Sequence, residues 1–143
     1  MLLLPKKFKY FKPFINKKLT NNWSNNDHRL KYSHLALISN QSGFISNRQI
    51  ETVRLLLRRL LKKKGQIYYC IFPNYSITKK PNEVRLGRGK GNVKYWACFI
   101  KKNTILIELT SYNIKMLILA LLAVKYKLGI KCFILNKHIR WIL

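Results

Sequence analysis

Positive charge outweighs negative charge so far in this chain that it limits what the chain can fold into by itself. Twenty-nine lysines and arginines stand against four aspartates and glutamates, which gives a formal net charge of +25. Because like charges repel one another in a compact state, we expect a large anionic partner. The charges run from Lys6 to Arg140 instead of gathering in one pocket, which argues against a small acidic substrate. Nucleic acid and an anionic membrane surface are the two partners that could neutralise so much charge.

The apolar content is high enough for a folded domain. Hydrophobic residues make up 48% of the 143 positions, so the chain is not simply a disordered basic tail. Its length fits one domain with a real core. The longest uninterrupted apolar stretch, Met116–Val124, has about half the ~20 residues that a membrane-spanning helix needs. We therefore expect no membrane insertion.

The three cysteines indicate neither a disulfide framework nor a metal site. Cys70, Cys98 and Cys132 lie far apart, with no CxxC pair and no histidine at a zinc-ligand spacing. Their odd number fits a reducing compartment. Each lies in an apolar run, so we expect three small buried side chains and no metal or cofactor.

A helix is predicted from about Asn47 to Lys64. Ser46 followed three residues later by Gln49 is the pattern of a capping box, and Gly65 is expected to end the helix. Apolar residues recur at helical spacing on one face, at Ile50, Val53, Leu56, Leu57, Leu60 and Leu61. Arginines and lysines lie mostly on the other side, which would meet solvent or phosphate.

The remaining elements predict an α+β fold, with a small, mostly antiparallel sheet and two helices packed on it. A second, unusually apolar helix is expected at 113–127. Strands are expected at 67–72, 95–100, 104–109 and 130–135, with a further short one around 35–38; those at 95–100 and 104–109 would form a hairpin through 101–103. The predicted division is an extended basic arm at 1–42, an α+β domain at 43–135 and a C-terminal tail at 136–143.

A long basic, glycine-rich loop between the first two main strands is the candidate functional segment. It runs from Pro73 to Lys94, too long for a passive connector in so small a domain. Alternating glycines would let the backbone approach phosphates, and the interleaved lysines and arginines would neutralise them. The glycines match neither a phosphate-binding P-loop nor a dinucleotide fingerprint, because Gly91 follows Lys90 and Asn92 stands where the last glycine is needed. A solvated turn is the plain alternative for the glycines alone.

Several short motifs along the chain resemble those of large-subunit ribosomal protein sixteen of bacteria, mitochondria and chloroplasts. The order and spacing hold from about Gly43 to Leu135, and Leu4–Lys12 is similar to the family's basic opening. The motifs are Arg48-Gln49-Ile50-Glu51, Ile71-Phe72-Pro73, Ile77-Thr78-Lys79-Lys80-Pro81, Val84-Arg85-Leu86-Gly87-Arg88-Gly89-Lys90-Gly91 and Tyr95-Trp96.

The resemblance implies an α+β protein that binds large-subunit rRNA near the peptidyl transferase centre and helps to position A-site tRNA, next to the P site. It implies no catalytic residue, since RNA forms the peptide bond. By position, the loop residues Lys79, Lys80, Arg85, Gly87, Arg88, Gly89, Lys90 and Gly91 would contact RNA. Arm residues Lys6, Lys7, Lys9 and Lys12 would enter rRNA grooves, and Arg54 and Arg58 would face an RNA helix.

The second helix departs from the family pattern, because relatives carry charged residues where this chain has Leu117, Ile118, Leu121 and Leu122. A hydrophobic patch over Leu117–Leu122, covered by an organelle-specific neighbouring ribosomal protein, is one interpretation; drift under compositional bias is the other. The abundance of Lys, Asn, Ile, Tyr and Phe is typical of an A+T-rich genome. With a beginning that matches the bacterial type and leaves no room for a cleaved leader, this bias favours an organelle-encoded protein of the mitochondrial ribosome, with a plastid or the bacterial cytoplasm as alternatives.

Three other functions are weighed against a ribosomal one. An RNA-processing enzyme is disfavoured because Asp27, Glu51, Glu83 and Glu108 are scattered and form no acid–base pair or two-metal site. A membrane-surface protein needs one helix with an apolar and a basic face, whereas 113–127 is apolar nearly all round. A free-standing basic RNA-binding or ribosome-assembly protein remains the main alternative.

Overall fold

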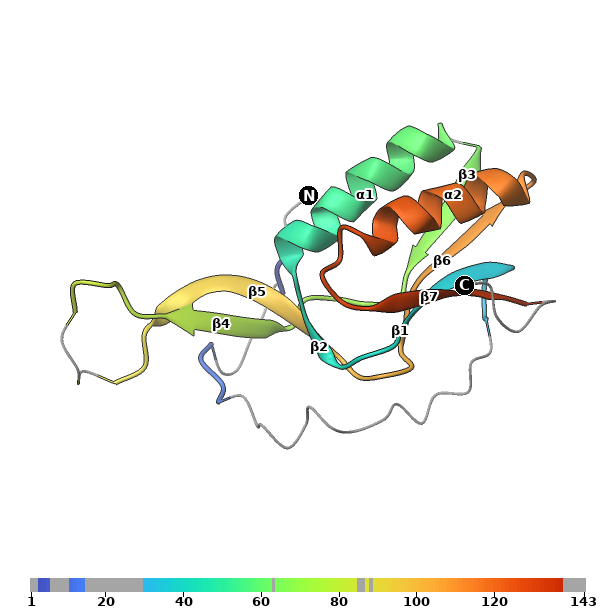
Figure 1. The fold of residues 1–143 in the computed structure, drawn as a ribbon. Coiled ribbons are helices and arrows are strands. Elements are labelled where there is room, and N and C mark those ends of the chain that lie inside the picture. The colour runs from blue at the N-terminus through green and yellow to red at the C-terminus, as the bar shows by residue number, and fades with distance from the viewer. Residues whose placement is uncertain are drawn as a thin grey trace.

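The computed structural model describes residues 3–5, 11–14, 30–62, 64–84, 87 and 89–137. Two α-helices lie side by side over one face of an antiparallel sheet, and a long β-hairpin projects from the body (Figure 1). The strands form two sheets, a four-stranded one in the order β3-β6-β1-β7 and a three-stranded one in the order β2-β5-β4. The predicted α+β class with antiparallel strands is confirmed.

The strands of the four-stranded sheet are β1 (Leu35–Ser39), β3 (Gly65–Tyr69), β6 (Ile105–Ser111) and β7 (Cys132–Asn136). β1 lies between β6 and β7, and every one of its side chains is buried. The short strand expected around 35–38 is therefore part of the packed body, although these residues fall within the range that the sequence assigned to the arm.

The first helix, α1 (Asn47–Leu61), begins where the sequence predicts. Ser46 accepts a hydrogen bond from the backbone N–H of Gln49, and the Gln49 side chain accepts one from the backbone N–H of Ser46, which completes the capping box. The helix ends three residues before the predicted end, because Lys62 takes a left-handed conformation with φ of 43°. Gly65 does not cap the helix; it opens β3, where an added Cβ would lie 2.8 Å from the carbonyl oxygen of Thr110.

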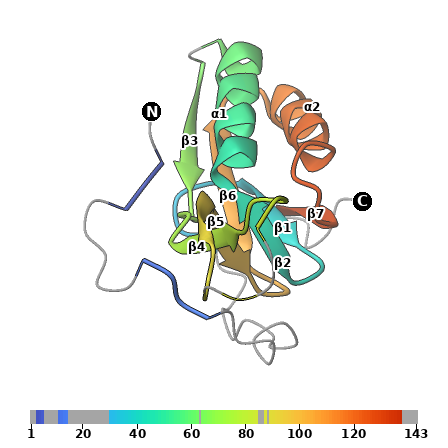
Figure 2. The same cartoon turned by 90° about the vertical axis from the view of Figure 1, so that its left-hand side faces the viewer.

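The second helix, α2 (Ile114–Lys125), is capped by the Asn113 side chain, which accepts from the N–H of Met116. The predicted outer patch over Leu117–Leu122 is wrong at Leu117 and Leu121. Leu117 and Leu121 are 1% and 0% exposed and pack into the core with α1 and the sheet. The apolar side chains that α2 does expose are Ile114 and Leu119. Figure 2 looks along the hairpin from its tip and shows both helices on the same side of the body.

The second sheet consists of β2 (Gly43–Ser46), β5 (Asn92–Ile100) and β4 (Tyr75–Lys79). The predicted hairpin through 101–103 is wrong, because β5 pairs with β2 and β4 while β6 pairs with β1 and β3. The chain crosses between the sheets at Ser39, whose hydroxyl donates to the carbonyl of Lys101 at 2.7 Å and accepts from the N–H of Thr104 at 3.1 Å. Asn103 supplies the left-handed turn, with φ of 66°.

A buried carboxylate joins the segment before β1 to the sheet. Glu108 in β6 is 1% exposed and accepts hydrogen bonds from the backbone N–H of Tyr32 at 2.9 Å and from the Ser33 hydroxyl at 3.2 Å. The Tyr32 ring stacks on Tyr68 of β3, with centroids 5.0 Å apart. Glu108 therefore has a structural position, although the sequence did not distinguish it from the other acids.

Two of the three cysteines are buried, as expected. Cys98 and Cys132 lie inside strands, and burial raises the pKa of the Cys132 thiol to about 11. Cys70 is exposed just after β3, so its predicted burial is wrong.

Candidate nucleic-acid interface

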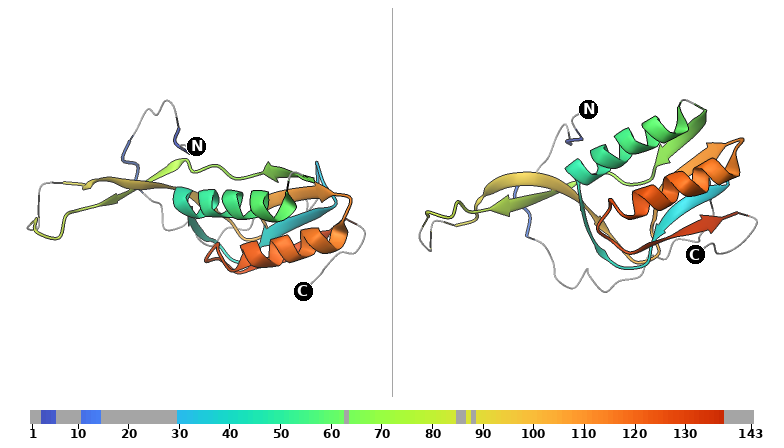
Figure 3. Two further views of the ribbon diagram at one scale, coloured as in Figure 1. Left: turned by 90° about the horizontal axis from the view of Figure 1, so that it is seen from above. Right: turned by 45° about the horizontal axis from the view of Figure 1, so that its top comes forward.

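Most of the predicted basic loop is a β-hairpin. Tyr75 pairs with Ala97 and Lys79 with Asn92, so β4 and the first half of β5 replace much of the loop predicted at 73–94. Of the described residues in this range, Pro73, Asn74 and those of the tip (80–84, 87 and 89–91) lie outside the paired strands. Figure 3 shows from two further directions that this hairpin extends away from α1, α2 and the four-stranded sheet. The strands thus carry the basic tip away from the core.

Glycine is needed at two kinds of position in the tip. An added Cβ at Gly91 would lie 2.7 Å from the carbonyl carbon and oxygen of Lys79, because the two strands approach closely there. Gly87 and Gly89 have φ of +111° and +68°, and nothing lies within 4 Å of an added Cβ at either position. Their backbone is therefore accessible on the side where a side chain would stand, which suits the predicted approach to phosphate.

Lys79 and Lys80 are exposed at the start of the tip. The Lys80 ammonium donates to the carbonyl of Gly87 at 2.5 Å, so it bridges the two sides of the turn. The two predicted arginines of this segment, Arg85 and Arg88, lie outside the described residues.

The N-terminal arm lies against the hairpin at 11–14. The buried Ser76 hydroxyl donates to the carbonyl of Phe11, and the Lys12 ammonium donates to the Asn92 side chain at 3.4 Å. Lys90 donates to the carbonyls of Lys12 and Pro13, the first at 3.1 Å, and lies 4.4 Å from the centroid of the Phe14 ring. Lys12 and Lys90, far apart in sequence, are thus brought together.

The contacts of Lys90 are with the protein itself. Its ammonium holds the arm, so a phosphate would have to share it with two backbone carbonyls. The other predicted arm residues, Lys6, Lys7 and Lys9, lie outside the described residues.

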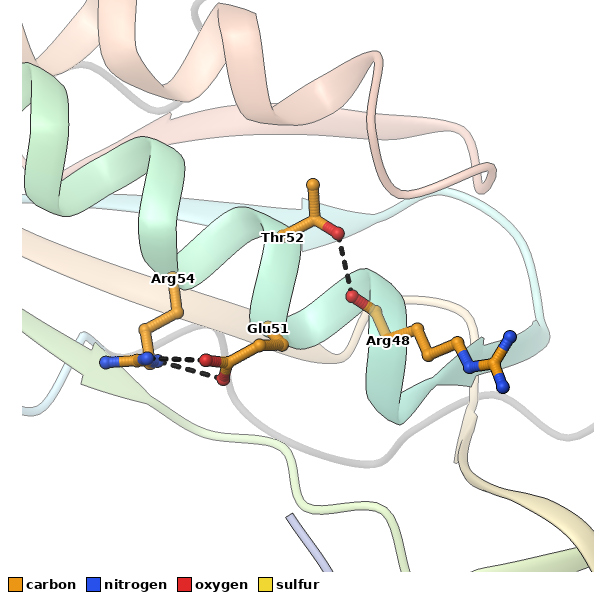
Figure 4. A network of polar contacts seen from close by, with 4 residues as sticks. All are labelled: Arg48, Glu51, Thr52 and Arg54. Carbon is orange, nitrogen blue, oxygen red and sulfur yellow. Dashed lines mark hydrogen bonds and ion pairs between the residues drawn. The ribbon is translucent and has the colours of Figure 1, made fainter. Parts of the chain in front are cut away.

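The basic face of α1 is separate from the hairpin tip. Arg54 forms a two-point pair with Glu51, at 2.9 Å from its Nε and 2.5 Å from its Nη2 (Figure 4). This hydrogen bond lowers the pKa of Glu51 and raises that of Arg54. Arg58 is exposed one turn further along.

Arg54 and Arg58 border a groove of about 990 Å³ between α1 and β3, together with Leu3, Tyr69 and Phe72. Burial raises the pKa of the Tyr69 phenol to about 12.

Sequence reasoning missed an aromatic cluster at the base of the hairpin. Phe44, Tyr75 and Phe99 come from three different strands, and their ring centroids lie 5.2 to 6.4 Å apart. All three are partly exposed. The alternation of residues along β5 could have indicated this cluster, because Tyr95, Ala97 and Phe99 share one face of the strand.

Neither a metal centre nor a spanning helix is found in the part of the chain that the structure describes. No three histidine, cysteine or acidic side chains come together there as metal ligands. None of the helices observed there has the length and apolar character required to cross a bilayer.

Comparison with known proteins identifies the family. A sequence model described as ribosomal protein L16p/L10e matches residues 5–135. The chain belongs to the ribosomal protein L16p/L10e family. The matched L16p/L10e range includes α1, α2, the strands from β1 to β6, most of β7 and the basic hairpin.

Curated relatives of this L16p/L10e chain share its length as well as its sequence. Large ribosomal subunit protein uL16 of Mycoplasma capricolum is 35% identical over 131 residues, covering 92% of this chain and 94% of the relative. The protein of the same name from Phytoplasma australiense is 34% identical over 141 residues, covering 97% and 99%. That of Christiangramia forsetii is 42% identical over 108 residues, covering 76% of each chain. The family resemblance suggested by the sequence motifs is confirmed.

Proposed function

We propose that this protein is a structural constituent of the large ribosomal subunit and binds large-subunit rRNA. The observation that carries the proposal is the exposed basic hairpin tip, held away from the packed body in a chain of net charge +25. Lys79 and Lys80 are placed to neutralise phosphates, and the open backbone at Gly87 and Gly89 allows close approach. Family membership and the names of the relatives support the same role. The role requires no catalytic residue from this chain.

The arm and α1 provide two further rRNA contacts in this proposal. Lys12 lies beside the hairpin, where the arm and the tip would follow one stretch of RNA together with the arm lysines Lys6, Lys7 and Lys9. Arg58 is exposed on α1, and Arg54, held by Glu51, presents its guanidinium in a fixed orientation that suits a phosphate or base edge.

The hairpin tip is proposed to help position A-site tRNA, with P-site tRNA as a neighbour. A tip that projects from the body on two paired strands can reach past the rRNA that surrounds the domain. Arg85 and Arg88 in the same tip would add charge to this contact.

A neighbouring ribosomal protein is proposed to cover the outer face of α2. Leu119 is 68% exposed and Ile114 is 52% exposed, so the candidate surface consists of these residues. A photocrosslinker at Leu119 should capture a protein within intact subunits, whereas one at Leu55, which is 54% exposed on α1, should capture RNA. RNA adducts at both positions would contradict a protein neighbour.

The host compartment is proposed to be the mitochondrial matrix, because the residue usage indicates an A+T-rich genome. A plastid ribosome and a bacterial ribosome are the alternatives, and the relatives named above come from bacteria. Detection of the protein in purified mitochondrial ribosomes, and its absence from plastid ribosomes, would support the first assignment; the reverse would contradict it.

Co-sedimentation tests the ribosomal role directly. The full chain should travel with large subunits through a sucrose gradient and should dissociate as salt increases, because each phosphate contact releases condensed counterions. Recovery only in the free-protein fractions, or equal recovery with small subunits, would contradict the proposal and favour a free-standing RNA-binding protein.

A further inference from the structure

A hollow lies where β2 ends, α1 begins and β5 passes beside them. Its walls are Phe44, Ser46, Arg48, Gln49, Lys94 and Tyr95, and its volume is about 530 Å³. That volume falls within the roughly 300–1,000 Å³ that is typical of small-molecule sites. None of its lining residues belongs to the hairpin tip, the arm or the Arg54–Arg58 face.

Two partly exposed aromatic residues, Phe44 and Tyr95, line this hollow. Phe44 pairs with Phe99 across the strands, and the alternation of side chains along β5 places Tyr95 and Phe99 on the same face. The Phe44 ring is held by Phe99, at 5.2 Å between centroids, and by Tyr75, at 6.3 Å. A fixed ring that solvent can reach offers a surface on which an unstacked nucleobase can lie.

Two exposed cations also line this hollow. Arg48 and Lys94 are both open to solvent, and their side chains take no part in a hydrogen bond or ion pair within the described ranges. Figure 4 shows the Arg48 guanidinium pointing away from the Glu51–Arg54 pair. Arg48 also stands in the first turn of α1, which contains no acidic residue. A cation at a helix N-terminus is unfavourable in the free protein, because the N-terminal end of the helix dipole is also positive. A bound anion near Arg48 would relieve this repulsion.

The polar groups between the rings and the cations are already occupied. The Gln49 side chain accepts from the Ser46 N–H at 2.8 Å and donates to the carbonyl of Leu128 at 3.3 Å. The hollow therefore offers stacking and charge but little hydrogen bonding to a base edge, which predicts weak sequence preference.

We propose that this hollow holds one unpaired nucleotide of RNA, with its base against Phe44 and Tyr95 and its phosphate between Arg48 and Lys94. The proposal rests on the proposed function, which makes large-subunit rRNA the source of that nucleotide. It adds a single-strand contact to the duplex and tip contacts described above. An acidic peptide or free phosphate would use the two cations and gain little from the rings.

The test compares two RNA probes of equal phosphate number, a short single-stranded oligouridine and a duplex, binding to the full chain at one salt concentration. Phe44→Leu should weaken single-strand binding about tenfold, because the base no longer stacks on an aromatic ring, and should leave duplex binding unchanged. Tyr126→Leu is the matched control, because Tyr126 is 82% exposed just after α2 and lies outside the hollow; it should change neither affinity.

The cations are tested by the salt dependence of the same binding. Arg48→Gln should reduce the slope of log affinity against log salt by about 0.7 for the single strand. Because Arg48 is exposed, this variant remains informative if Phe44→Leu disturbs the fold, which circular dichroism checks.

The proposal is overturned if Phe44→Leu weakens both probes equally, if neither variant changes single-strand binding, or if inorganic phosphate competes as well as oligouridine at equal charge. These results leave the ribosomal role intact as long as the unaltered chain still co-sediments with large subunits. Failure of co-sedimentation with retained single-strand binding would instead contradict the proposed function alone.

Discussion

In the body of the molecule, Leu57, Leu109 and Leu121 lose all exposure to solvent, whereas the described residues from Lys79 to Asn92 in the outer hairpin include no buried side chain. The body is held by apolar packing of α1 and α2 on the sheet. The hairpin is held by strand pairing, by the Lys80–Gly87 hydrogen bond across its turn and by contacts with the arm. The two regions therefore differ in what stabilises them.

This difference explains how a chain of net charge +25 folds at all. Burial of apolar surface stabilises the body and offsets the repulsion between its surface charges. The tip contributes no side chain to the core, so an exposed lysine such as Lys79 is available to an anionic partner. Substitutions in the body should consequently change the free energy of unfolding, whereas substitutions in the hairpin should change local amide exchange and RNA binding.

The largest expected effect is on the core. Leu57→Ala should lower the free energy of unfolding by about 2–5 kcal/mol, because it removes a fully buried side chain and leaves a cavity. Urea denaturation followed by circular dichroism measures this decrease. Leu55→Ala on the same helix is the control, since Leu55 is 54% exposed, and it should have a much smaller effect. Equal decreases at the two positions would contradict the assigned face of α1.

A smaller effect is expected at the buried carboxylate. Glu108→Ala should destabilise the protein by about 1–3 kcal/mol, because the backbone N–H of Tyr32 is left without its acceptor, whereas the Ser33 hydroxyl keeps the Leu35 carbonyl. Amide hydrogen exchange at Tyr32 should speed up in this variant. Glu83→Ala, at an exposed acid of the hairpin tip, should leave both stability and exchange unchanged. A stable Glu108→Ala protein with unaltered exchange would show that this contact does not join the two segments.

The smallest expected effect on global stability is at the hairpin tip. In Gly91→Ala, the new methyl group would meet the backbone of Lys79, and local crowding of this kind costs about 1–3 kcal/mol. The hairpin should open near Lys79 and Asn92 while the body stays folded, so amide exchange should rise only there. Gly43→Ala is the matched control, because its Cβ would approach no backbone atom within 4 Å and would meet only the Ile130 side chain, at 3.2 Å. A decrease in global stability would mean that the hairpin and the body fold as one unit.

Features governed by neighbouring residues could be predicted from the sequence. The capping box of Ser46 and Gln49 and the start of α2 at Asn113 depend on contacts within one turn of helix, and both are found. The partners of each strand depend on packing across the chain. The local sequence at Lys101–Asn103 predicts a hairpin turn. In the structure Ser39 hydrogen-bonds to this turn, and the strands on either side of the turn belong to different sheets.

The candidate site divides in the same way. The positive φ at Gly87 and Gly89 is accessible because glycine has no side chain. The sequence therefore predicts the exposed backbone at these two positions. The contact of Lys90 with Lys12 and Pro13 joins residues more than seventy positions apart, and no periodicity indicates it. The hollow beside Phe44 likewise forms only when β2 pairs with β5, because Phe44 and Tyr95 come from these two strands.

The salt dependence of RNA binding tests most directly whether the hairpin is the RNA-binding region. With a duplex fragment of large-subunit RNA, replacing Lys79 and Lys80 by glutamine should reduce the slope of log affinity against log salt by about 0.9 for each phosphate that is no longer neutralised. Lys115 lies in the first turn of α2 and Lys127 lies just after the helix, and both are exposed. Replacing these two lysines by glutamine removes the same charge and should leave the slope nearly unchanged. Equal slopes for the two double variants, or a larger change for the α2 pair, would contradict this assignment.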